Sequence, residues 1–66
     1  MKFSERLKEL RLEKNLSQEQ LSHETGLSQS SITKWEREER DPTLKALIAL
    51  ADFFQVTIDY LAGREN

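Results

Sequence analysis

The stretch that decides the fold is residues 17–36, SQEQLSHETGLSQSSITKWE. Ser17 is predicted to cap the N-terminus of a helix, and Gln20, three residues later, completes a capping box. Gly26 is predicted to end this helix, because glycine adopts the left-handed conformation there at little cost. Ser28 then caps a second helix. The short connection between the two helices forces them to cross steeply, as in a helix-turn-helix.

Apolar residues in this stretch fall where each helix should meet a core. Leu16 and Leu21 flank the first cap at the spacing of a hydrophobic staple, and Leu27 and Ile32 flank the second. On a helical wheel, Ile32 and Trp35 point inward. The opposite side of the second helix is therefore left to polar residues.

A further helix is predicted before this stretch, from Ser4 to Asn15. Ser4 is a suitable N-cap. Phe3, Leu7 and Leu10 recur at helical spacing and predict the buried stripe of this helix.

After the stretch, residues 37–41 are polar and without period, which predicts a loop. Pro42 and Thr43 introduce the next helix, with Thr43 as its cap. This helix is apolar over more than one stripe, which is typical of a helix at the centre of a domain. Its predicted buried face comprises Leu44, Leu47, Ile48, Ala51 and Phe54, with Leu50 and Phe53 widening it.

A last short helix is predicted to begin near Thr57 and to end at Gly63, with Val56 and Leu61 as its staple. No strand pattern and no internal repeat are present. The sequence thus predicts an all-α, compact five-helix fold, with residues 1–66 forming one domain.

Composition excludes several classes of protein. The chain has 66 residues and no Cys, so it has neither a disulfide framework nor a Cys-based zinc site. A core of this size leaves little room for a deep catalytic pocket. The N-terminus lacks an apolar signal segment, and no apolar run approaches the roughly 18 residues needed to cross a membrane. We expect a cytoplasmic protein.

Charge and histidine content bear on ligands. A formal charge of −2 counts against nucleic-acid binding, which favours a basic surface. The charge is uneven, since residues 1–16 carry five Lys/Arg against three Glu, whereas residues 46–66 carry one against three acidic residues. His23, the only histidine, is expected to face solvent. No metal site, no cofactor and no catalytic constellation are predicted.

The outward face of the second helix of residues 17–36 carries side chains that suit DNA bases. An α-helix fits the major groove, where its N-terminal residues meet the base edges. Gln29 suits adenine, Lys34 suits guanine, the Thr33 methyl suits thymine, and Ser30 can bond to several bases. Arg37 lies on the same side. The alternative is a polar helix face that is merely solvated.

These patterns together resemble the Xre/Cro-type helix-turn-helix family of bacterial and phage repressors, whose domains are lambda-repressor-like. The resemblance runs from Leu7 to Gly63. The residues that carry it are Leu16-Ser17-Gln18-Glu19-Gln20-Leu21, Gly26-Leu27-Ser28, Ser31-Ile32, Lys34-Trp35-Glu36-Arg37, Arg40, Pro42-Thr43-Leu44 and Val56-Thr57-Ile58-Asp59-Tyr60-Leu61.

The resemblance implies roles for individual positions. Gln18 matches a glutamine that holds a phosphate and buttresses the recognition helix. Arg37 and Arg40 match positions near flanking phosphates. Arg11 and Glu36 match a structural ion pair, and their helical wheels also place both on inward edges. The implied base-reading residues are Gln29, Ser30, Thr33 and Lys34.

The sequence departs from the family pattern in the loop after the second helix of the motif. Glu38 stands where the family usually has Gly, and Glu39 and Asp41 stand where Lys is frequent. Acidic side chains beside phosphates weaken the non-specific electrostatic part of binding. We therefore expect base readout and dimerisation to matter more than bulk charge.

A dimer is expected from the symmetry of such operators. Helix-turn-helix repressors bind pseudo-palindromic sites as two-fold dimers. With no separate dimerisation domain in these 66 residues, the predicted interface is Phe53, Ile58 and Tyr60. The alternative is that these residues only close the core.

Two functional hypotheses follow. The first is a sequence-specific regulator of transcription that binds double-stranded DNA, has no enzymatic activity, and acts as a repressor. The second is an antitoxin or regulatory adaptor that uses the same fold for protein–protein interaction, which the acidic loop favours. Salt-dependent DNA binding discriminates between them.

Overall fold

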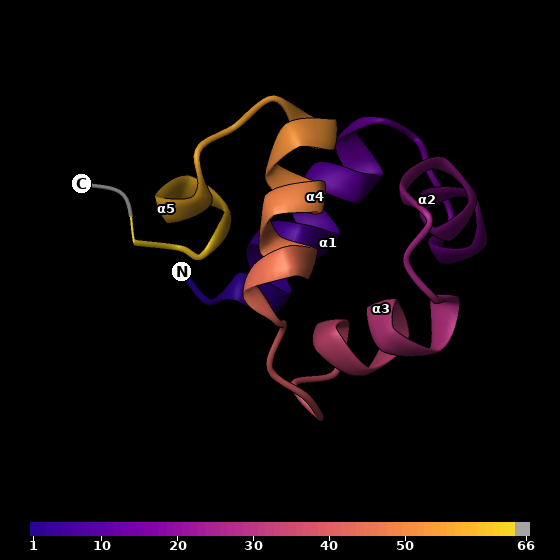
Figure 1. Ribbon diagram of the computed structural model, residues 1–66, viewed down its shortest axis with the longest axis horizontal. Coiled ribbons are helices and arrows are strands. Elements are labelled where there is room, and N and C mark those ends of the chain that lie inside the picture. The colour runs from indigo at the N-terminus through magenta and orange to yellow at the C-terminus, as the bar shows by residue number, and fades with distance from the viewer. Residues whose placement is uncertain (65–66) are drawn as a thin grey trace.

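Five α-helices make up the computed structural model, which describes residues 1–64 (Figure 1). Helices α1 and α4 overlap at the centre of this view, with α2 and α3 to one side and α5 to the other. Helix α1 contacts both α3 and α5, while α4 contacts both α2 and α5. The part of the chain that is described contains no strand, so the all-α prediction is confirmed there. The helices are α1 (Phe3–Glu13), α2 (Gln18–Thr25), α3 (Gln29–Glu36), α4 (Leu44–Phe54) and α5 (Ile58–Leu61).

The predicted start and end of α2 and the predicted start of α3 are confirmed. The Ser17 hydroxyl accepts from the Gln20 backbone N–H at 3.0 Å, and the Gln20 side chain accepts from the Ser17 backbone N–H at 2.8 Å. Gly26 ends α2 with a left-handed φ of 77°. The Ser28 hydroxyl accepts from the Ser31 backbone N–H at 3.1 Å and so caps α3. These local bonds fix the turn between the two helices.

The predicted bounds of the first helix are wrong at both ends. Helix α1 begins at Phe3, and the backbone N–H of Lys2 donates to the Glu5 carboxylate at 3.0 Å. Ser4 lies buried in the first turn and is not the cap. The helix stops at Glu13, and Asn15 adopts a left-handed φ of 57°. The Glu5 bond places the N-cap at Lys2, two residues before the predicted cap at Ser4.

The buried face of α4 also differs from the prediction. Leu44 and Ile48 are 66% and 45% exposed, although the sequence pattern placed both in the core. Leu50 and Ala51 are buried, as predicted, and Ala46, which was not predicted to be buried, lies with them in the core. Phe54 is buried and Leu47 half-buried, as predicted.

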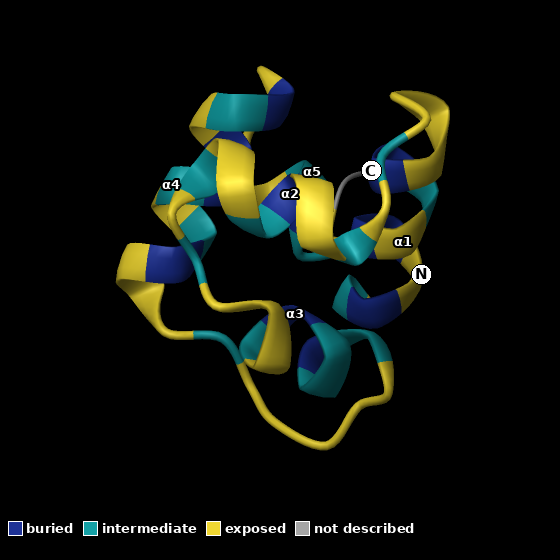
Figure 2. Ribbon diagram, turned by 90° about the vertical axis from the view of Figure 1, so that its right-hand side faces the viewer, coloured by how far each residue is buried: buried dark blue, intermediate teal, exposed yellow. Residues whose placement is uncertain are grey.

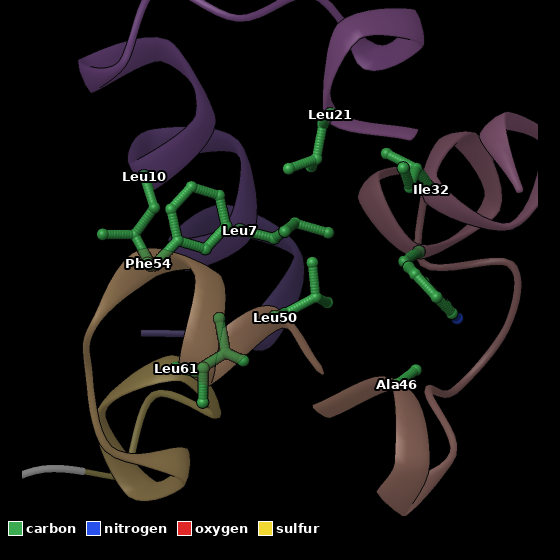
Figure 3. Packing of buried hydrophobic residues seen from close by; sticks show 10 residues of the cluster. Leu7, Leu10, Leu21, Ile32, Ala46, Leu50, Phe54 and Leu61 are labelled. Carbon is green, nitrogen blue, oxygen red and sulfur yellow. The ribbon is translucent and has the colours of Figure 1, made fainter. Parts of the chain in front are cut away.

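The core lies where all five helices meet (Figure 3). Leu7, Leu21 and Leu50 are fully buried and converge from α1, α2 and α4. Deleting a side chain of this kind to Ala costs about 2–5 kcal/mol, so each is a main contributor to stability. The buried apolar residues are Leu7, Leu10, Leu21, Ile32, Trp35, Ala46, Leu50, Ala51, Phe54 and Leu61.

Helix α5 closes the domain and ties the C-terminal end to the N-terminus. The Thr57 hydroxyl accepts from the Tyr60 backbone N–H at 3.0 Å and caps α5, which confirms that this helix begins near Thr57. Gly63 has a left-handed φ of 80°, and a Cβ built there would lie 1.8 Å from the Met1 carbonyl oxygen. Only glycine fits this position. No helix within residues 1–64 has both the length and the apolar character that a membrane span requires.

Candidate nucleic-acid interface

The outward side of α3 forms a shallow polar hollow of about 300 Å³. Gln29 and Ser30 are exposed at its N-terminal end, and Thr33 and Lys34 are half-buried one turn later. Ile32 and Trp35 point the other way into the core, which fixes this side of the helix outward. The structure thus brings all four predicted base-reading residues together. The hollow is lined by Gln29, Ser30, Thr33, Lys34, Arg37 and Glu39.

Gln18, at the start of α2, lies behind this hollow. Its side-chain oxygen accepts from the Thr33 hydroxyl at 2.6 Å, and its side-chain nitrogen donates to Glu36 Oε1 at 3.1 Å. Both ends of the amide are therefore engaged with α3. The side chain links the first helix of the motif to the second.

Arg11 and Glu36 join α1 to the end of α3. Arg11 Nε donates to Glu36 Oε2 at 2.8 Å, and Arg11 Nη2 donates to Oε1 at 3.0 Å. Arg11 Nη1 donates to the Leu16 carbonyl at 2.7 Å, which also holds the connection before α2. The hydrogen bond to Glu36 raises the pKa of Arg11.

This ion pair is almost closed to solvent. The side chains of Arg11 and Glu36 are 9% and 5% exposed. Bidentate guanidinium–carboxylate geometry satisfies several polar groups at once. Removing one partner would leave a buried charge alone, at a cost of about 3–5 kcal/mol.

Arg40, which the resemblance also assigns to a flanking phosphate, does not line the hollow. Its Nη1 donates to the Ser31 hydroxyl at 3.3 Å, on a different side of α3. The chain turns sharply after α3 because Glu38 adopts a left-handed φ of 62°. Figure 2 shows the loop that follows as an exposed segment beneath α3.

The acidic residues of this loop are not all directed at the hollow. Glu39 lines it, whereas Glu38 pairs with Lys2 at 3.1 Å. The hydrogen bond to Glu38 raises the pKa of Lys2. Asp41 lies beside Arg40 and Pro42, in two other surface depressions. Glu39 is therefore the one carboxylate in the lining of the hollow, which also includes the cationic side chains of Arg37 and Lys34.

The three predicted dimer residues differ in how far they are available. The Tyr60 ring is covered by the guanidinium of Arg6, 3.7 Å from the ring centroid. Phe53 is half-buried and packs edge-on against Phe54. Ile58 is 36% exposed.

Arg6 is a structural residue that the sequence analysis missed. It is only 6% exposed and lies on the Tyr60 ring, and its Nε is 3.4 Å from Glu9 Oε1. Phe3 and Leu10, three residues before it and four after, share its side of α1. This spacing could have predicted that Arg6 packs on apolar surface, since long cationic side chains cover such surface with their aliphatic stems.

His23 is exposed on α2, as expected. Within residues 1–64, no group of three or more His, Cys, Asp or Glu side chains is arranged to hold a metal ion.

Comparison with known proteins gives the class to which this fold and hollow belong. The sequence pattern of the family described as Helix-turn-helix matches residues 7–61. The chain belongs to this family, of the Xre type, and its five helices have the lambda-repressor-like arrangement.

The relatives that match this chain include proteins named as regulators of transcription. The chain is 43% identical to the HTH-type transcriptional activator BcrR of Enterococcus faecalis, over 100% of this chain and 32% of that protein. It is 41% identical to the Cryptic phage CTXphi transcriptional repressor RstR of Vibrio cholerae, over 97% of this chain and 57% of that protein. It is 39% identical to the Control protein C.SmaI of Serratia marcescens, over 97% of this chain and 76% of that protein. The chain thus spans about a third and just over half of the lengths of BcrR and RstR.

Proposed function

We propose that this chain is a sequence-specific regulator of transcription that inserts α3 into the major groove of double-stranded DNA. The observation that carries the proposal is the α3 hollow, where four side chains able to bond to bases share one outward side. The opposite side of the same helix is fixed by Ile32 and Trp35 in the core. A helix held in this way can present its polar side to base edges without reorganising.

Four side chains of the hollow have a chemically suitable target on DNA. Gln29 can pair with adenine through N6 and N7, and Lys34 with guanine through O6 and N7. Ser30 can bond to several bases. Arg37, at the C-terminal end of the hollow, is placed for a flanking phosphate. Gln18 contributes its backbone N–H at the start of α2, where helix N–H groups suit a phosphate.

Arg40 is proposed as a second phosphate contact. It would reach a different part of the DNA backbone from Arg37. Its bond to the Ser31 hydroxyl leaves other guanidinium donors available. The two arginines would then hold α3 from two sides.

We further propose that the protein binds a pseudo-palindromic operator as a homodimer. One domain supplies few base contacts, and half-sites about one helical turn apart would double them. Ile58 is the most exposed of the predicted interface residues, so it should form the centre of the contact, with Phe53 and Tyr60 at its edge. Ile58→Asp should abolish the dimer. Leu44→Asp, at an exposed apolar position on α4, is the matched control, and a dimer lost only in that variant would move the interface to α4.

The regulator is proposed to act as a repressor by occupying a promoter. We propose that it acts in the cytoplasm, needs no cofactor and catalyses no reaction. RstR is named a repressor and BcrR an activator, so relatives of this domain act in both directions. A reporter gene placed behind the selected operator tests the direction.

The decisive experiment is selection of bound sequences from a random DNA pool, followed by a fluorescence titration on the selected site. Affinity should fall steeply between about 50 and 200 mM salt, because several phosphate contacts release counterions. Lys34→Ala should lose affinity and relax one position of the site. Lys8→Ala removes the same charge from an exposed position on α1 and should change much less.

The alternative is a protein-interaction module on the same fold. The net charge of −2 and the exposed Leu44 and Ile48 on α4 favour it. A protein that selects no sequence and shows no salt-sensitive DNA binding at low ionic strength would establish this alternative.

A further inference from the structure

Side chains behind the hollow determine whether the Thr33 hydroxyl donates or accepts a hydrogen bond on the outward side of α3. Glu36 is a carboxylate held by two Arg11 donors, and its Oε1 also accepts from Gln18. A carboxylate has no hydrogen to donate. Whatever side-chain group faces Glu36 at this point must therefore be a donor.

That requirement orients the Gln18 amide. Its nitrogen must face Glu36, at 3.1 Å, so its oxygen faces the other way. The oxygen lies 2.6 Å from Thr33 Oγ1. Because an amide oxygen only accepts, the Thr33 hydroxyl must give its single proton to Gln18.

The consequence appears on the DNA-facing surface. Thr33 is half-buried and lines the α3 hollow beside Lys34 and Gln29. A free hydroxyl can either donate or accept, so it does not discriminate among bases by polarity. With its proton committed to Gln18, Thr33 has only lone pairs left to offer.

We infer that Thr33 is a specificity-determining residue that acts as a hydrogen-bond acceptor and selects a base carrying an exocyclic amino group. In the major groove these groups are adenine N6 and cytosine N4. The Arg11–Glu36–Gln18 chain is the device that positions it. This inference rests on the proposed insertion of α3 into DNA, and it names the chemistry read at one position of the half-site.

Ser30 provides an internal comparison. It lies in the same hollow and is exposed, and its hydroxyl makes no hydrogen bond to any other described residue. The Ser30 hydroxyl can therefore either donate or accept a hydrogen bond. The base read by Ser30 should therefore be less restricted than the base read by Thr33.

The test combines Thr33→Val with DNA that lacks a single amino group. Selection from a random pool with the wild-type protein and with Thr33→Val identifies the position that depends on Thr33. The wild type should enrich adenine or cytosine there, and Thr33→Val should lose only that preference, by roughly 3- to 10-fold, the worth of one hydrogen bond. Ser30→Ala should leave that position unchanged.

The second step replaces the enriched base by an analogue without the amino group, purine in place of adenine or pyrimidin-2-one in place of cytosine. Wild-type affinity should fall by the same factor of roughly 3 to 10, while the affinity of Thr33→Val should not change. Equal losses in both proteins would overturn the inference. Enrichment of guanine or thymine at the Thr33-dependent position would also overturn it, as would the absence of any position that depends on Thr33.

A wild-type protein that enriches no sequence would refute the proposed function itself, whereas enrichment without a Thr33 effect refutes only this inference.

Discussion

Two ion pairs connect the N-terminal segment to the end of α3, and they differ mainly in burial. Arg11 and Glu36 are 9% and 5% exposed, and both oxygens of the carboxylate are engaged. Lys2 and Glu38 are 68% and 54% exposed and share one contact of 3.1 Å. The buried pair is a structural joint of the motif, whereas solvent screens the exposed pair. Burial therefore decides which of these two ion pairs stabilises the fold appreciably.

The largest effect is expected from breaking the buried pair. Arg11→Met should reduce the free energy of unfolding by about 3–5 kcal/mol, because it leaves Glu36 buried without its guanidinium. Urea denaturation followed by circular dichroism measures this loss. The double variant Arg11→Met/Glu36→Leu should recover much of it, since no unpaired charge remains. A double variant as unstable as Arg11→Met would show that the guanidinium acts mainly through its bond to the Leu16 carbonyl.

A smaller change, in the opposite direction, is expected at Glu38. Glu38→Gly should stabilise the domain by about 1 kcal/mol, because Glu38 holds a left-handed φ of 62° that glycine adopts without steric cost. Glu38→Ala is the matched control. It removes the contact to Lys2 but keeps the backbone strain, so its midpoint in urea should stay close to that of the wild type. Equal stabilisation by both substitutions would assign the effect to charge and not to conformation.

The two pairs should also respond differently to high pH. The hydrogen bond to Glu36 raises the pKa of Arg11 above its ordinary value, so the contribution of this pair is complete below that ordinary value and is lost only as the pH rises through the raised pKa. The pKa of Lys2 is raised above 10.5, so its contribution is complete below pH 10.5 and is lost as the pH rises through the raised value. Because Lys2 is exposed, that loss should be small. Thermal melts of the wild type and Lys2→Ala should converge as the pH rises above the pKa of Lys2, and a divergence there would contradict this assignment.

The smallest effect concerns charge in the α3 hollow. Glu39→Gln removes the one carboxylate that lines it and should increase affinity for the selected operator by about threefold near 0.1 M salt. Asp52→Asn removes the same charge from an exposed position on α4 and should change affinity less. Fluorescence titration of both variants measures the difference. Equal gains would mean that overall charge matters and not its position.

The sequence predicted the motif well because its signals are local. Ser17, Ser28 and Thr43 each accept a backbone hydrogen bond within three residues, and Gly26 takes the left-handed conformation expected of it. The same reasoning was wrong at Ser4, because the bond from the Lys2 backbone N–H to the Glu5 side chain places the N-cap two residues earlier.

Predictions about the surroundings of side chains were correct for some residues and wrong for others, because those surroundings depend on residues far apart in the chain. The outward placement of Gln29, Ser30, Thr33 and Lys34 followed from one helix alone, and the structure brings them together. The sequence could not show that Arg40 would bond to Ser31, outside the hollow that Arg37 lines, because the backbone turn at Glu38 directs this part of the chain. Leu44 and Ile48 looked buried, since periodicity alone does not show which side of an apolar helix meets the core.

The sequence by itself determined the helices, the caps and the short turn between α2 and α3, because bonds and steric limits within a few residues fix them. Tertiary structure alone decided that Arg6 covers Tyr60, that Leu44 and Ile48 of α4 are exposed, and that a buried carboxylate on α3 orients Gln18 and thereby the hydroxyl of Thr33. These outcomes require side chains from different helices to meet in space. Their geometry and hydrogen-bond polarity are defined only when the helices have packed.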